Sequence, residues 1–130
     1  MLKLALAGEP RYRIDIRELA PGASGYTVDT LKSLRAETGS TDSLYLLLGG
    51  DQYAALATWQ RPDEVKKLAR IAVFARPGFK PAGKDAETVT MTPMSISASD
   101  IRARVARGSS IAGSVPEPVW KYIMEHKLYH

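Results

Sequence analysis

Two short, uninterrupted apolar runs limit this chain to few folds. Leu44–Leu48 is one run and ends at Gly49–Gly50, while Ile71–Phe74 is the other and stops before Pro77–Gly78. Apolar runs without polar alternation are typical of strands that are covered on both faces of a parallel sheet. Because parallel neighbours need a crossover between them, and a helical pattern separates these runs, the sequence predicts an α/β domain with a mainly parallel sheet.

The other elements follow from periodicity and capping signals. Alternation of apolar and charged residues predicts strands over Tyr12–Ile16 and Glu87–Met91. Helical spacing of apolar residues predicts helices over Met1–Gly8, 25–37, 62–70, 98–107 and from Pro116 onward. The last helix is expected to place an apolar face in the core, formed by Val119, Trp120, Ile123 and Met124.

Composition bounds the class of protein. A chain of 130 residues is expected to form one domain, 1–130. The net charge is +4, but basic and acidic residues are interspersed, so we expect no nucleic-acid partner. The chain has no cysteine, which excludes disulfides and thiolate metal sites. No apolar run approaches the roughly 20 residues of a membrane span, so we expect a cytoplasmic protein without a membrane partner.

The segment from Ser95 to Arg102 has the pattern of a helix start that binds phosphate. Ser97 followed three residues later by Asp100 is a capping-box pattern, and the apolar helix face begins at Ile101. The first amides of a helix lack an intrahelical partner, and the helix dipole makes that end positive. The Ser99 hydroxyl and the Arg102 guanidinium add two groups that attract an anion. A capped helix alone, however, more often has no ligand.

The same segment resembles a known signature. Ile96–Arg104, ISASDIRAR, is similar to the second signature, of the ISSTxxR type, of the nucleotidylyltransferase superfamily, with Ser99 where threonine is common. The resemblance implies that Ser97, Ser99 and Arg102 contact the triphosphate of ATP, with Arg102 as the catalytic candidate. Arg76 is expected near phosphate as well, whereas Arg104 and Arg107 are expected on the solvated side of the helix.

Further segments resemble one branch of that superfamily, the bacterial nicotinate mononucleotide adenylyltransferases. They are Ser24–Leu31 (SYTxxTL in the family), Leu48–Asp51 (LGxD), Thr58–Trp59 with Arg76–Phe79 (TW…RPGY), and Val115–Tyr129 (VPxxVxxYIxxHxLY). The resemblance implies a Rossmann-like, doubly wound, mainly parallel sheet. It also implies adenylyl transfer from ATP to nicotinate mononucleotide, with release of pyrophosphate and with Mg²⁺ on the phosphates.

The resemblance assigns further site residues, and each has a structural alternative. Gly49 and Asp51, after a strand end, are implied at the ATP ribose, but Asp51 is equally suited to cap a short helix. Trp59 is implied to stack on the nicotinate ring, although an indole more often fills a core. The amides near Tyr26 and Thr27 are implied at the nicotinate carboxylate. The alternative there is helix capping by Ser24 or Thr27.

The first signature of the superfamily, GGTFDPxHxGH, does not occur in this sequence, whose only histidines are His126 and His130. The chain therefore resembles the C-terminal two-thirds of such an enzyme with the N-terminal strands missing, and we expect little activity from it alone. In the 3-2-1-4-5 strand order of such folds, Tyr12–Ile16 would be strand three and Leu44–Leu48 strand four. Leu44–Leu48 would then have an unpaired edge that can form a homo-oligomer.

Other interpretations stay open. The chain is also compatible with a sister adenylyltransferase that acts on another phosphate ester, such as phosphopantetheine, which has no need of Trp59. A non-catalytic nucleotide-binding fragment is a second alternative, and a basic nucleic-acid binder is the least favoured. His126 and His130 have a spacing that suits a metal, but no third ligand is near, so no metal site is expected.

Overall fold

A computed structural model describes residues 1–39, 41–74, 85–92 and 96–129. The predicted Arg76–Phe79 segment and Ser95 lie outside the described residues. The chain divides into two compact units, one formed by Met1–Asp15 with Met94–His130 and the other by Ile16–Pro93.

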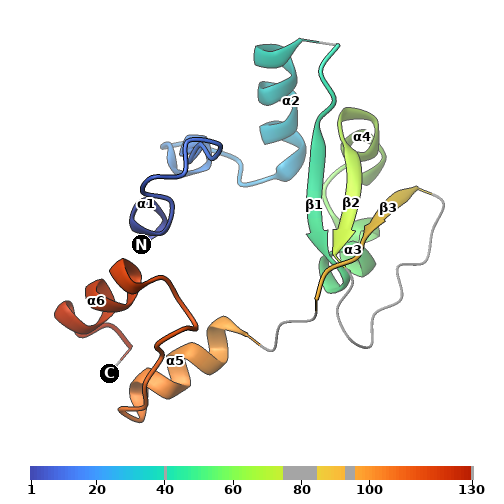
Figure 1. Ribbon diagram of the computed structural model, residues 1–130. Helices are drawn as coiled ribbons and strands as arrows, with labels where there is room; N and C mark the ends of the chain where they lie inside the picture. Colours follow the sequence, from blue (N-terminus) through green and yellow to red (C-terminus); the bar gives the residue numbers. More distant parts are fainter. Residues whose placement is uncertain (40, 75–84, 93–95, 130) are drawn as a thin grey trace. The chain divides into compact units, whose positions relative to one another are not determined.

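The Ile16–Pro93 unit contains a three-stranded sheet of β1 (Tyr45–Gly49), β2 (Arg70–Phe74) and β3 (Ala86–Val89) (Figure 1). The strand order is β1-β2-β3, and both pairs are parallel. In register, Leu46 lies opposite Ile71, and Ile71 lies opposite Ala86. The predicted α/β class with a parallel sheet is confirmed.

The helices of this unit were predicted in part. They are α2 (Thr27–Thr38), α3 (Gly50–Ala55) and α4 (Pro62–Leu68), with short 3-10 turns η1 (Arg17–Leu19) and η2 (Leu56–Thr58). Gly39 ends α2 at φ +82°, a conformation that glycine adopts without strain. The helices predicted over 25–37 and 62–70 are confirmed. α3 lacks a helical apolar period, and a short helix here was considered only as the alternative role of Asp51.

The core of this unit lies against one face of the sheet. Leu48, Ile71 and Val73 form that face, and the buried cluster is completed by Val28, Leu31, Leu56, Val65 and Ala69. The opposite face of β1 is open, because Leu47 is 61% exposed and Tyr45 is also exposed. The prediction that Leu44–Leu48 is covered on both faces is therefore wrong. An uninterrupted apolar run is typical of a buried strand, but burial of both faces also requires other elements that pack on each face.

The predicted strand over Tyr12–Ile16 is also wrong. The backbone there forms no strand and leads into η1, and Ile16 is 63% exposed. A strand is held by the N–H and C=O groups of a neighbour, and within the described residues no strand pairs with this segment. Alternation indicates which side chains could share a face. It does not provide the partner.

The other unit is helical, with α1 (Leu2–Ala5), α5 (Ala98–Ala106) and α6 (Glu117–Glu125). α1 is shorter than the predicted Met1–Gly8 helix. The core of this unit contains Val105, Ile111, Val119 and Ile123, with the half-buried Trp120 packed against it. Met124 was predicted in this core but is 47% exposed. No helix among the described residues is both long and apolar enough to cross a bilayer.

Candidate functional site

The start of α5 has the capped geometry that its sequence predicted. Ser97 is the N-cap residue in an extended conformation, and its Oγ accepts a hydrogen bond of 3.1 Å from the Asp100 amide. The first turn therefore presents the amides of Ala98 and Ser99 at the positive end of the helix dipole. All of these residues are exposed, so an anion in solution can reach them.

Ser99 and Arg102 meet on the exposed side of this turn. Nη2 of Arg102 donates to Oγ of Ser99 over 3.4 Å, and both side chains are exposed. Residues three apart on a helix are neighbours on its surface, which explains the contact. A hydroxyl and a guanidinium thus lie together beside the free amides of the helix start.

Arg104 does not lie on the solvated side of α5, and that prediction is wrong. Its Nη1 donates to Oγ of Ser114 over 3.0 Å, and its Nη2 donates to the carbonyl of Ser110. The side chain is half-buried and ties the helix to the segment that follows it. The sequence does not indicate this role, because it depends on where the chain returns after the helix. Arg107 is exposed, as predicted.

Gly49 and Asp51 lie at the carboxyl end of β1. Gly49 is the N-cap residue of α3, so the alternative that Asp51 caps a helix is wrong; Asp51 lies in the first turn and is exposed. A Cβ atom at position 49 would lie 2.7 Å from Oδ1 of Asp51. The missing side chain of Gly49 therefore gives the Asp51 carboxylate its place above the strand end.

If Asp51 accepts hydrogen bonds from the ATP ribose, as the resemblance implies, Gly49→Ala is expected to weaken MgATP binding by about 2- to 10-fold, the factor that corresponds to one ordinary hydrogen bond. The new methyl group displaces the Asp51 carboxylate, while φ of −72° at position 49 suits alanine, so stability changes by less than about 1 kcal/mol. Titration calorimetry measures the affinity. In an Asp51→Ala background Gly49→Ala should have no further effect, and an additive loss would contradict the explanation.

Tyr26 and Thr27 form the start of α2. Tyr26 is the N-cap residue, and its amide donates to Oγ of Ser24 over 3.2 Å. The alternative that Ser24 or Thr27 caps the helix is wrong, because within the described part of the chain no side chain caps α2. α2 runs in the opposite direction to β1 (Figure 1), so its amide end points the same way as the carboxyl end of the sheet.

Trp59 follows η2 directly and is half-buried. Part of the indole packs against the core cluster that contains Val28 and Leu56, and the remainder is accessible. The core role of Trp59 is therefore confirmed in part, and its stacking on nicotinate stays a prediction. One part of the ring fills the core edge, and the accessible part offers a flat surface for an aromatic ligand.

Asp29 connects these two segments, and sequence reasoning missed it. Its Oδ2 accepts from the Ser24 hydroxyl over 2.7 Å, and its Oδ1 lies 2.5 Å from Nη2 of Arg61. The Ser24 hydrogen bond and the Arg61 guanidinium hold the pKa of Asp29 below its usual value. The only sequence signal is an acidic residue in a first helical turn, which is common. Nothing in the sequence indicates that Arg61 is its partner.

A second ionic link joins α2 to α4. Nζ of Lys32 lies 2.8 Å from Oε1 of Glu64, and this hydrogen bond lowers the pKa of the Glu64 carboxyl. Glu64 also approaches Nη1 of Arg61 at 3.5 Å. Asp29 and Glu64 therefore hold the same two helices together from neighbouring positions, but only Asp29 also contacts Ser24.

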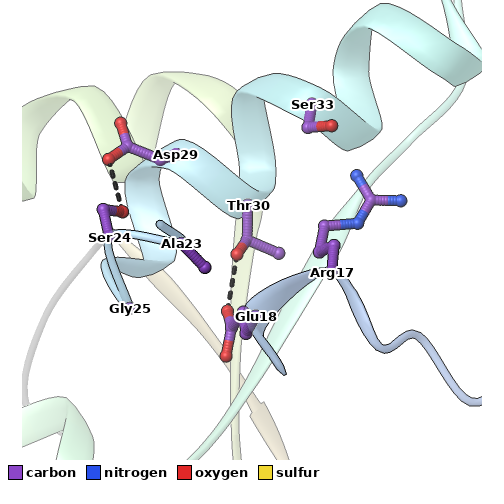
Figure 2. A pocket seen from close by; sticks show the side chains of 8 residues that line it. All are labelled: Arg17, Glu18, Ala23, Ser24, Gly25, Asp29, Thr30 and Ser33. Atoms are coloured by element: carbon purple, nitrogen blue, oxygen red, sulfur yellow. Dashed lines mark hydrogen bonds between the residues drawn. The ribbon is translucent and has the colours of Figure 1, made fainter. Parts of the chain in front are cut away.

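A pocket of about 200 Å³ lies beside the first turns of α2 (Figure 2). One side is formed by the segment that carries Arg17 and Glu18, and another by Ser24 and Asp29. Oγ1 of Thr30 donates to Oε1 of Glu18 over 2.5 Å. Ser24 forms its hydrogen bond with Asp29, and Thr30 forms its own with Glu18. These two side-chain hydrogen bonds hold the start of α2 in place.

The predicted site residues fall into two groups, one in each unit. Tyr26, Thr27, Gly49, Asp51 and Trp59 all belong to the Ile16–Pro93 unit, whereas Ser97, Ser99 and Arg102 belong to the other. His126 stacks on Tyr122 with ring centroids 4.0 Å apart, and its Nδ1 lies 3.0 Å from the Tyr122 carbonyl. Among the described residues, no three carboxylate or histidine side chains are placed to hold a metal ion.

Comparisons with known proteins show the family of the chain. Residues 1–104 match the family model of cytidylyltransferase-like proteins. The chain is 41% identical to the "Probable nicotinate-nucleotide adenylyltransferase" of Laribacter hongkongensis, over 99% of this chain and 69% of that protein. It is 40% identical to the one of Bordetella petrii, over 99% and 70%. The chain thus spans about 70% of the length of these relatives.

A solved structure agrees at the level of the fold. The Plasmodium falciparum nicotinic acid mononucleotide adenylyltransferase complexed with APC matches 99% of this chain and 72% of that one, with a TM-score of 0.75. The identity is 18%, so this likeness shows the fold alone.

Proposed function

Because the chain belongs to the cytidylyltransferase-like family and, within it, to the nicotinate-nucleotide adenylyltransferases, we propose that it binds MgATP and nicotinate mononucleotide for adenylyl transfer. In this reaction an oxygen of the acceptor phosphate forms a bond to the α-phosphorus of ATP. The bond from the α-phosphorus to the bridging oxygen breaks, and pyrophosphate leaves with that oxygen. The observation that carries the proposal is the capped start of α5, where Ser99 and Arg102 meet beside free amides.

The role of α5 in this proposal is to hold the phosphates of ATP. The free amides and the helix dipole stabilise negative charge, the Ser99 hydroxyl donates to a phosphate oxygen, and Arg102 supplies a fixed positive charge. Adenylyl transfer between two phosphates needs no covalent nucleophile from the protein. Positioning of the reactants and stabilisation of the developing charge are the contributions that this geometry supports.

The role of the Ile16–Pro93 unit is to bind the nucleoside and acceptor groups. Asp51 is suited to accept hydrogen bonds from ribose hydroxyls, with Gly49 allowing the close approach. The amides that follow Tyr26, at Thr27 and beyond, suit the carboxylate of nicotinate, and the accessible part of Trp59 suits its ring. An acceptor without an aromatic ring, such as phosphopantetheine, would leave Trp59 unused.

Magnesium enters this proposal as part of the substrate. The described residues do not gather the carboxylates of a protein-only metal site. Mg²⁺ keeps several waters and commonly binds through substrate phosphates, so the ion is expected on the triphosphate itself. The cytoplasm stays the expected compartment.

Binding measurements test the acceptor. Titration calorimetry of nicotinate mononucleotide, nicotinamide mononucleotide and phosphopantetheine separates the candidates, because only the first combines a pyridine ring with a carboxylate. We expect nicotinate mononucleotide to bind at least about 10-fold more tightly than nicotinamide mononucleotide, whose amide is neutral. This factor corresponds to the free energy of one charge-assisted hydrogen bond. Tighter binding of phosphopantetheine would contradict the proposal and favour a sister enzyme.

We expect Arg102→Ala to weaken binding of MgATP and pyrophosphate by about 10- to 100-fold, because one charge-assisted contact is lost. Folding should be almost unchanged, since the side chain is exposed and alanine favours the helix. Arg107→Ala, an exposed arginine at the other end of α5, is the matched control and should bind normally. A large fall in melting temperature with unchanged anion binding would show that Arg102 is structural instead.

A further inference from the structure

We propose that Asp29 is the positioning residue of the acceptor site: its carboxylate fixes the amide start of α2 and the Trp59 loop relative to each other. The inference rests on the proposed function, since both segments are the proposed nicotinate contacts. Asp29 itself is not one of the proposed ligand contacts.

One carboxylate oxygen of Asp29 is linked, through Ser24, to the start of α2. The Ser24 hydroxyl donates to Oδ2 of Asp29 over 2.7 Å and, through the same oxygen, accepts from the Tyr26 amide over 3.2 Å. A hydroxyl can donate once and accept at the same time, so Ser24 relays the position of the carboxylate to the backbone at the N-cap. Figure 2 shows Ser24 and Asp29 facing each other across this turn. The Thr27 amide therefore has a fixed direction.

The other carboxylate oxygen of Asp29 is linked, through Arg61, to the loop that carries Trp59. Nη2 of Arg61 lies 2.5 Å from Oδ1 of Asp29, and Arg61 is two residues after Trp59. Arg61 is also the N-cap residue of α4, with φ +52° and ψ +58°. Residues other than glycine rarely adopt this left-handed conformation, and they keep it where surrounding contacts determine it. The ion pair with Asp29 is such a contact, so it helps to set the direction in which the chain leaves Trp59.

The pairing also resolves an electrostatic conflict. A carboxylate in the first turn of α2 would repel the carboxylate of nicotinate if its charge were uncompensated. The Arg61 guanidinium on one oxygen and the Ser24 hydroxyl on the other compensate that charge. Asp29 can then orient the helix start while the amide end stays attractive to an anion.

Glu64 provides a matched control. It joins the same two helices through Lys32 at 2.8 Å and approaches Arg61 at 3.5 Å, and like Asp29 it has a lowered pKa. It does not contact Ser24. If the ionic link between α2 and α4 were all that mattered, Glu64→Gln and Asp29→Asn would have the same effect.

The experiment uses the full chain with Trp120→Phe, so that Trp59 is the only tryptophan. Quenching of its fluorescence by nicotinate mononucleotide reports acceptor binding, and calorimetry reports MgATP binding. We expect Asp29→Asn to raise the Kd for nicotinate mononucleotide by about 10-fold, the value of one charge-assisted hydrogen bond. The emission maximum of Trp59 should also shift in the absence of ligand. MgATP binding should not change, and Glu64→Gln should leave both ligands unaffected.

The outcomes are distinct. Equal affinity for nicotinate mononucleotide in Asp29→Asn and the parent overturns the inference, and so does an equal loss in Glu64→Gln. A parent chain that does not bind nicotinate mononucleotide overturns the proposed function and this inference with it. Should Asp29→Asn unfold, Ser24→Ala is decisive, because it removes only the link through the Ser24 hydroxyl: selective loss of acceptor affinity supports the inference, and no loss overturns it.

Discussion

The 130-residue polypeptide on its own is expected to release pyrophosphate from MgATP and nicotinate mononucleotide at least about 100- to 1000-fold more slowly than an intact relative, which is the cost of one lost charge stabiliser. These residues contain no GGTFDPxHxGH segment, whose histidines the resemblance places at the transferred phosphoryl group. His126 is engaged in a ring stack with Tyr122. Arg102 and the α5 dipole stabilise only part of the charge that develops.

A coupled pyrophosphate-release assay measures this turnover, with the Laribacter hongkongensis relative assayed in parallel as the reference. Calorimetry with MgATP is the control, because binding through α5 should persist where turnover is lost. Slow turnover with measurable MgATP binding supports the explanation. Turnover comparable with the relative would contradict it and would require another source of charge stabilisation within these residues.

Elements that depend on local signals were predicted correctly from the sequence. The α5 start needs only Ser97 and the Asp100 amide three residues later, and both lie within one turn. The end of α2 at Gly39 is equally local. β1 and β2 were also predicted, because one apolar run ends at Gly49–Gly50 and the other stops before Pro77–Gly78. In each of these cases the residues that decide the structure are close neighbours in the sequence.

Features that depend on a distant partner were not predicted. Tyr12–Ile16 alternates like a strand, but no neighbouring strand within the described residues completes it. Arg104 was expected in solvent and instead contacts Ser114, ten residues away. The Asp29–Arg61 pair spans 32 residues, and neither residue has a pattern that indicates the other. Periodicity reports which faces are apolar; it does not report which segments will meet.

The open edge and face of β1 lead to the second prediction, which concerns association. β1 is an edge strand that pairs only with β2 among the described residues, and its exposed side carries Tyr45 and Leu47. The strand has no charge, proline or bulge of the kind that normally protects an edge. Its free N–H and C=O groups are therefore a template for another strand.

We expect the purified chain to self-associate as its concentration rises, through β1 of two copies, and Leu47→Lys to reduce this association. Burial of one leucine side chain contributes about 1.5–3 kcal/mol, so its loss should raise the dissociation constant at least about 10-fold per copy. A charge on this face would also remain unpaired in the interface. Because Leu47 is 61% exposed in the single chain, the melting temperature extrapolated to low concentration should change little.

Multi-angle light scattering over a concentration series measures the association. Leu19→Lys is the matched control, since Leu19 is 82% exposed but belongs to η1 and not to a strand. An equal effect of both substitutions would mean that general surface hydrophobicity drives association. A monodisperse monomer at all concentrations, with cooperative unfolding, would mean that the β1 edge is protected in solution. If Leu47→Lys weakens association and Leu19→Lys does not, the contact is assigned to β1, because Leu47 lies on the uncovered side of that strand and Leu19 does not.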